Sequence, residues 1–167
     1  MLEFACFLIF PAAMAFAGSM DLFTMTIPNR ISLVLIVSFV LILPFAPFSW
    51  MGVASHFGAF ALMLAVGIGL FAGGFLGGGV AKLLAVAALW LGFERLLEYL
   101  VLASICGGIL SVAILIYRAM APPLFLCNQP WAMRLHEKTG GVPYGIALAA
   151  AGLWIYPTTS WFQSFAV

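Results

Sequence analysis

The longest stretch without a charged residue decides which folds are open to this chain. No Asp, Glu, Lys or Arg occurs between Arg30 and Lys82, and none follows Lys138. Of the 167 residues, 66% are hydrophobic and 7% are charged, whereas an ordinary soluble domain has about 25% charged residues. So few charges cannot cover the surface of a water-soluble fold. The composition therefore predicts an all-α, polytopic integral membrane protein.

The apolar runs predict how many times the chain crosses the bilayer. A spanning helix needs about 20 predominantly apolar residues, which leaves room for about six transmembrane helices. The expected segments are 4–20, 31–43, 57–71, 81–91, 100–117 and 144–156. Between them lie prolines, glycines or charged residues, which favour breaks. Residues 118–143 form the one long connection, expected along the membrane surface.

The N-terminal run has no positive region before it, so we expect a first membrane helix rather than a cleaved leader. Neither an internal repeat nor a separate soluble region is evident. We therefore expect residues 1–167 to form a single membrane-embedded domain.

Lysine and arginine positions predict the orientation, because short cytoplasmic loops carry an excess of them. With six spans, only Arg95 falls on one side. The other side receives Arg30, Lys82, Arg118, Arg134 and Lys138. We expect that second side to be cytoplasmic, so both termini face away from the cytoplasm.

Several classes of site are disfavoured by the sequence. The net charge is +1, and no basic patch is dense enough to predict nucleic-acid binding. The three cysteines form no CxxC pair, so neither a zinc site nor a disulfide framework is suggested. His56 is expected in a non-cytoplasmic loop and His136 on the opposite side, so they cannot share a metal. We therefore expect no metal and no cofactor.

Two features could carry chemistry. Asp21 ends the first apolar segment, where an ionisable group is costly. It is either a catalytic or ion-binding carboxylate, or a helix-end charge in the interfacial water. The glycines of residues 73–79 allow a turn and close backbone approach, or ordinary close packing of helices through small residues. Lys82 is expected to anchor its helix at the interface, with its ammonium in water.

Three motifs together resemble the signatures of type IV prepilin peptidases, a family of GxGD aspartic membrane proteases. MDL at residues 20–22 and IPNR at residues 27–30 resemble the first signature. GGGVAKLL at residues 77–84 resembles the second, and GVPYGIA at residues 141–147 resembles the segment that opens the last helix. The resemblance is closest to the compact branch serving tight-adherence (Flp-type) pili, which lacks the cysteine-containing N-terminal domain linked to methyl transfer.

The resemblance implies a bacterial inner-membrane endopeptidase that cuts the leader from prepilins or pseudopilins at the cytoplasmic face. Two aspartates would activate water for this reaction. Asp21 matches the first, but Val80 occupies the position of the second and can neither donate nor accept a proton. The resemblance further suggests site-shaping or substrate-binding roles for Pro28, Asn29, Gly77, Gly78, Gly79, Lys82, Pro143 and Tyr144.

We therefore expect this chain to bind substrate without cleaving it, within the lipid bilayer and a pilus-assembly system. Val80 is either an engineered substitution, which its otherwise intact motif favours, or a natural variant. A non-enzymatic pilus-assembly component stays an alternative. A small proton-coupled transporter using Asp21 is another, but it leaves the glycine motif unexplained.

Overall fold

A computed structural model of the protein describes residues 2–46, 48–122, 126–137 and 140–165. Lys138, which entered the charge count above, lies outside this part. All regular elements within it are helical, which confirms the predicted all-α class. They are α1 (Leu2–Thr24), α2 (Asn29–Ile42), η1 (Leu43–Phe45), α3 (Trp50–Ala72), α4 (Gly78–Ala119), α5 (Pro130–His136), α6 (Tyr144–Ile155), η2 (Tyr156–Thr158) and α7 (Ser160–Phe165).

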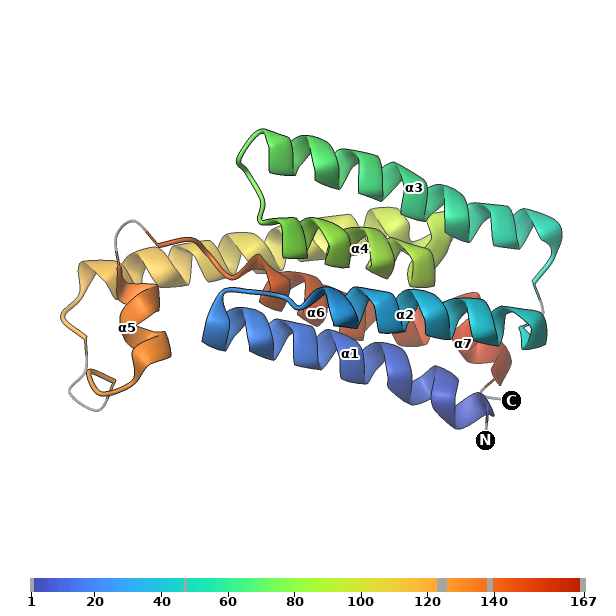
Figure 1. The fold of residues 1–167 in the computed structure, drawn as a ribbon, viewed down its shortest axis with the longest axis horizontal. Coiled ribbons are helices and arrows are strands. Elements are labelled where there is room, and N and C mark those ends of the chain that lie inside the picture. Colours follow the sequence, from blue (N-terminus) through green and yellow to red (C-terminus); the bar gives the residue numbers. More distant parts are fainter. Residues whose placement is uncertain (1, 47, 123–125, 138–139, 166–167) are drawn as a thin grey trace.

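The long helices run back and forth along one axis, and the two termini lie at the same end of the bundle (Figure 1). The opposite end contains the α1–α2 loop, the α3–α4 turn, α5 and the start of α6. We call this the motif end, and the end near the termini the kink end. By length and composition, α3 and α4 could cross a membrane. Six crossings and their orientation stay predictions.

Helix α4 is two helical limbs joined at Gly92. This residue has φ 64° and ψ 177°, a combination that essentially only glycine adopts. The chain turns back there, so the second limb runs antiparallel to the first (Figure 1). The two segments expected at 81–91 and 100–117 are therefore separate helical passes. The turn between them is at Gly92, inside the break at residues 92–99 that separates the two predicted segments, and Glu94 and Glu98 lie near the start of the second limb.

The side chains of α3 replace the hydrogen bond that this kink breaks. In an uninterrupted helix the Phe93 N–H would donate to the Leu89 carbonyl. Here the Phe93 N–H donates to Ser55 Oγ at 3.2 Å. His56 Nδ1 lies 2.8 Å from the Leu89 carbonyl oxygen, so the ring donates to that oxygen. The predicted loop position of His56 is wrong, because α3 already begins at Trp50 and buries this ring.

Aromatic packing joins the helices that carry the motifs. The Trp90 ring is fully buried, 5.3 Å from the ring of Phe10 and 6.0 Å from that of Tyr156 between centroids. Its indole N–H donates to the Leu35 carbonyl of α2 at 3.1 Å. One side chain thus links α1, α2, α4 and the end of α6, so the motif-bearing helices share one rigid core.

Candidate active site

Three of the helices at the motif end begin with residues singled out in the sequence. Their N-terminal flanking residues are Pro28 for α2, Gly77 for α4 and Pro143 for α6. Asn29, Gly78 and Tyr144 are the first helical residues. Helix N-termini carry partial positive charge and unpaired N–H groups. Such N–H groups are potential partners for Asp21, which lies near the end of α1.

Asp21 is buried in the interior of the bundle. The sequence placed it at the end of its helix, but α1 continues to Thr24 and only 4% of Asp21 is exposed. The reading as a helix-end charge in interfacial water is therefore wrong. The Gly145 N–H donates to Asp21 Oδ2 at 2.6 Å. Since Pro143 provides no side-chain cap, Asp21 caps α6 from a different helix.

Two missing side chains allow the first motif to contact the second and the third. A Cβ on Gly145 would lie 2.7 Å from Asp21 Oδ2 and 2.8 Å from Ile27 Cδ1. A Cβ on Gly79 would lie 3.0 Å from Ile27 Cβ and 3.1 Å from its carbonyl oxygen. Ile27 therefore touches both the start of α4 and the start of α6. Val80, the residue after Gly79, is buried in the same apolar core as Ile27.

The remaining predicted residues take structural positions around this centre. Lys82 Nζ donates to Asn29 Oδ1 at 2.9 Å, which joins the first turns of α4 and α2. This bond gives Lys82 a defined partner beyond the expected anchoring role. The Tyr144 hydroxyl and Ser111 Oγ share a hydrogen bond of 3.1 Å, so Tyr144 packs α6 against the second limb of α4.

Two arginines hold the connection that leads into α6. Arg134 Nη1 donates to the Phe23 carbonyl at 2.8 Å, which ties α5 to the end of α1. Arg118 donates to the carbonyls of Leu135, Gly140 and Gly141 at 2.8–2.9 Å. In the sequence, Arg118 and Arg134 served only to predict the orientation of the chain in the membrane. These backbone contacts could not be found from residue type, because their acceptors are carbonyls that every residue has.

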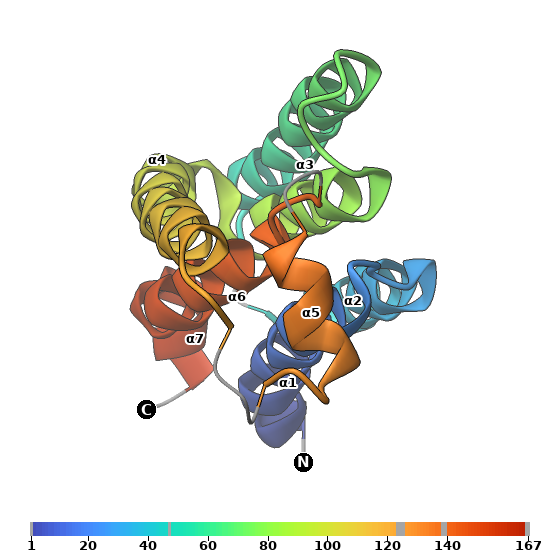
Figure 2. The ribbon, with the colours of Figure 1, turned by 90° about the vertical axis from the view of Figure 1, so that its left-hand side faces the viewer.

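Ile27 and Gly145 were also missed as site residues, although both fall inside the quoted motifs. Their importance comes from contact with Asp21 and Gly79, which no local pattern reveals. Figure 2 looks along the bundle from the motif end and shows α5 beside the end of α1.

A second carboxylate near Asp21 is missing from the described residues. Glu94 and Glu98 follow the Gly92 kink at the opposite end of the bundle. Glu137 is exposed at the C-terminal end of α5. Within the same residues, no group of three His, Cys, Asp or Glu could hold a metal ion. The centre therefore offers one buried carboxylate, backbone donors and glycine-rich backbone.

A comparison with protein families matches the type IV leader peptidase family over residues 8–112, which is more than half of the chain. The chain belongs to this family. Its members are aspartic proteases that process prepilins, so a prepilin leader peptidase-like membrane protein is established at the family level. The match includes Asp21 and Val80 but ends before Pro143 and Tyr144. Searches of curated proteins and of solved structures found no match.

Proposed function

We propose that this chain binds prepilin leaders at the cytoplasmic face of the bacterial inner membrane and, with Val80, does not cleave them. One observation carries the proposal. Val80 follows Gly79 at the start of α4 and is 9% exposed, within the core that also holds Ile27. The family pattern expects a carboxylate there. A buried isopropyl group cannot move a proton, so Asp21 has no catalytic partner.

The chemistry explains why one carboxylate is insufficient. One aspartate must be ionised to deprotonate the attacking water, while the other is protonated to polarise the scissile carbonyl. Two close carboxylates achieve this by sharing one proton, because ionising both is costly. With Val80, only one carboxylate of this pair is left. No step requires a cofactor.

Substrate recognition does not require the second carboxylate. The resemblance implies a short basic leader followed by a hydrophobic helix, and the Asp21 carboxylate attracts basic residues. Gly77, the residue before α4, has open space where a side chain would lie, so a substrate backbone can approach it closely. We assign the chain to the compact branch of the family that serves tight-adherence pili. The whole chain, residues 1–167, forms the proposed peptidase domain.

A processing assay tests this function. Purified chain is incubated with a tight-adherence prepilin in lipid vesicles, and loss of the leader is followed by gel mobility and mass spectrometry. We expect no cleavage with Val80, cleavage with Val80→Asp, and none with Val80→Asp combined with Asp21→Ala. Equal cleavage by the Val80 and Val80→Asp chains would overturn the two-aspartate reading.

A non-enzymatic assembly component is the second candidate, and the Asp21–Gly145 bond favours it. Because Asp21 caps α6, the fold has a use for this carboxylate that is independent of catalysis. If the chain retains prepilin in a pull-down while Val80→Asp fails to restore cleavage, this candidate replaces the first. Failure of both binding and cleavage would reject both candidates.

A further inference from the structure

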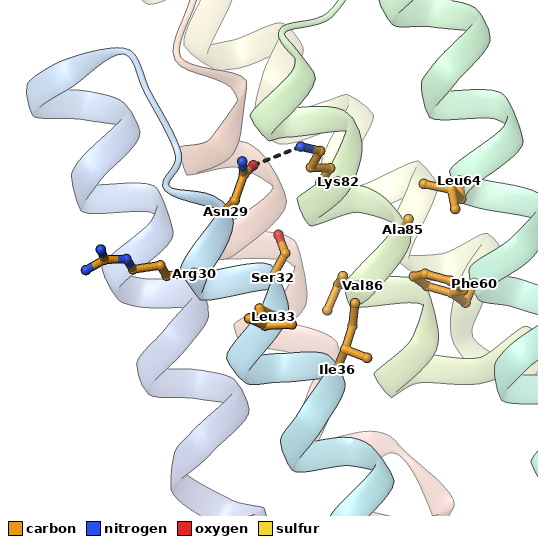
Figure 3. Close-up of a pocket in the computed structure, with 10 residues that line it drawn as sticks. All are labelled: Asn29, Arg30, Ser32, Leu33, Ile36, Phe60, Leu64, Lys82, Ala85 and Val86. Carbon is orange, nitrogen blue, oxygen red and sulfur yellow. Dashed lines mark hydrogen bonds between the residues drawn. The ribbon is translucent and has the colours of Figure 1, made fainter.

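An apolar groove lies between α2, α3 and the first limb of α4, close to the motif end (Figure 3). Its volume is about 410 Å³. Ile36 of α2, Phe60 and Leu64 of α3, and Val86 of α4 line its apolar part. The groove shares Lys82 and Asn29 with the surroundings of the candidate site, but Asp21, Val80 and Gly145 do not line it.

One end of the groove is polar and positively charged. Lys82 and Asn29 line it and are joined by their 2.9 Å hydrogen bond. Ser32 is only 7% exposed, and its hydroxyl points toward the gap between Lys82 and Asn29 (Figure 3). Within the described residues, this hydroxyl has no hydrogen-bond partner and Lys82 has no ion pair with a carboxylate. A hydroxyl without an internal partner beside an unneutralised ammonium fits an anionic oxygen ligand.

We propose that the groove binds one acyl chain of an anionic glycerophospholipid, with the lipid phosphate at Lys82, Asn29 and Ser32. The polar residues lie toward the end of the bundle, and the apolar lining extends along the helices. This is the order of headgroup and chain in one bilayer leaflet. Lys82 supplies the charge, and Ser32 and the Asn29 side-chain amide supply hydrogen-bond donors.

Size and charge distinguish this occupant from a substrate helix. The groove is lined by residues 29–36 of α2, which cover about 10 Å along that helix. A substrate helix must cross about 30 Å of hydrocarbon. The basic leader implied for prepilins would also be repelled by Lys82. A narrow chain with an anionic head satisfies both constraints.

The two cations near the groove provide a matched pair of variants. Arg30 also lines the groove edge, but its guanidinium points to the other side of α2 (Figure 3). Native mass spectrometry can count phosphatidylglycerol and phosphatidylcholine, with identical acyl chains, that stay bound to the full chain. We expect the chain to prefer phosphatidylglycerol by about five- to tenfold. Lys82→Gln should abolish this preference, and Arg30→Gln should retain it.

A second pair of variants tests the apolar part. Leu33 lines the groove, whereas its neighbour Val34 lines the opposite side of α2 toward α1; both are more than half exposed. Leu33→Trp should reduce binding of both lipids several-fold, and Val34→Trp should leave it unchanged. Equal retention of the two lipids by the unmodified chain, or equal effects of Lys82→Gln and Arg30→Gln, would overturn the proposal. Displacement of the lipid by a prepilin leader-helix peptide would instead assign the groove to the substrate.

Discussion

The two ends of the bundle differ in how the backbone groups at helix breaks and helix starts are hydrogen-bonded. At the kink end, α4 breaks at Gly92, and Ser55 and His56 of α3 bind two backbone groups at the break. At the motif end, α2, α4 and α6 begin without any side-chain cap of their own, and Asp21 caps only α6. The difference separates a structural break, which is closed by hydrogen bonds, from a region where backbone donors stay available to a ligand.

The largest expected effect concerns the motif end. Val80→Asp should raise prepilin cleavage at least about a hundredfold over the Val80 chain, since acid–base catalysis contributes about 10²–10⁴. The restored rate should rise and then fall with increasing pH, because one carboxylate must be ionised and the other protonated. Cleavage rates measured across pH 4–9 check this. A rate independent of Asp21 would show that the introduced acid works alone.

Among the variants tested for stability, a substitution at the kink should lower the free energy of unfolding most. Gly92→Ala places a Cβ 3.0 Å from His56 Cε1 at φ 64°, so we expect a loss of about 1–3 kcal/mol in the free energy of unfolding. Thermal unfolding in detergent measures it. Gly108→Ala on the second limb is the control, because a Cβ there meets no atom within 4 Å. That control should be neutral or gain up to about 1 kcal/mol.

The structural role of Asp21 can be separated from its charge. Asp21→Asn keeps a side-chain oxygen for the Gly145 N–H, whereas Asp21→Ala removes it. We expect Asp21→Ala to be less stable than Asp21→Asn by about 1–2 kcal/mol, the usual effect of losing a helix cap. Chemical denaturation of both variants in the Val80 chain measures the difference. Equal stabilities would mean that the bond to Gly145 contributes nothing to folding.

The smallest expected effect concerns one hydrogen bond at the kink, from the Phe93 N–H to Ser55 Oγ. Ser55→Ala removes the acceptor of the Phe93 N–H and should cost about 1 kcal/mol, measured by thermal unfolding. Ser104→Ala is the matched control, because Ser104 Oγ only donates to the Leu100 carbonyl of its own helix. If the two variants lose the same stability, the α3 side chains do not support the kink.

Lys82 shows where sequence reasoning about single residues reaches its limit. Its position after the glycines predicted an anchor at the interface. Its bond to Asn29 of α2, and its place at the end of an apolar groove, depend on which helices α4 touches. His56 is a clearer failure, since its neighbours Leu89 and Gly92 lie more than thirty residues away.

The sequence by itself determined the all-α class, most of the helical segments and the order of the three motifs, and it places Val80 where the family resemblance implies an acid. These follow from local hydropathy, glycine and proline positions and residue chemistry, all readable within short windows. The tertiary structure alone decided that Asp21 is buried against Gly145, that Ile27 connects α4 to α6, and that Gly92 is repaired by α3. Each of these contacts joins residues far apart in the chain, and such pairs leave no periodic signal in the sequence.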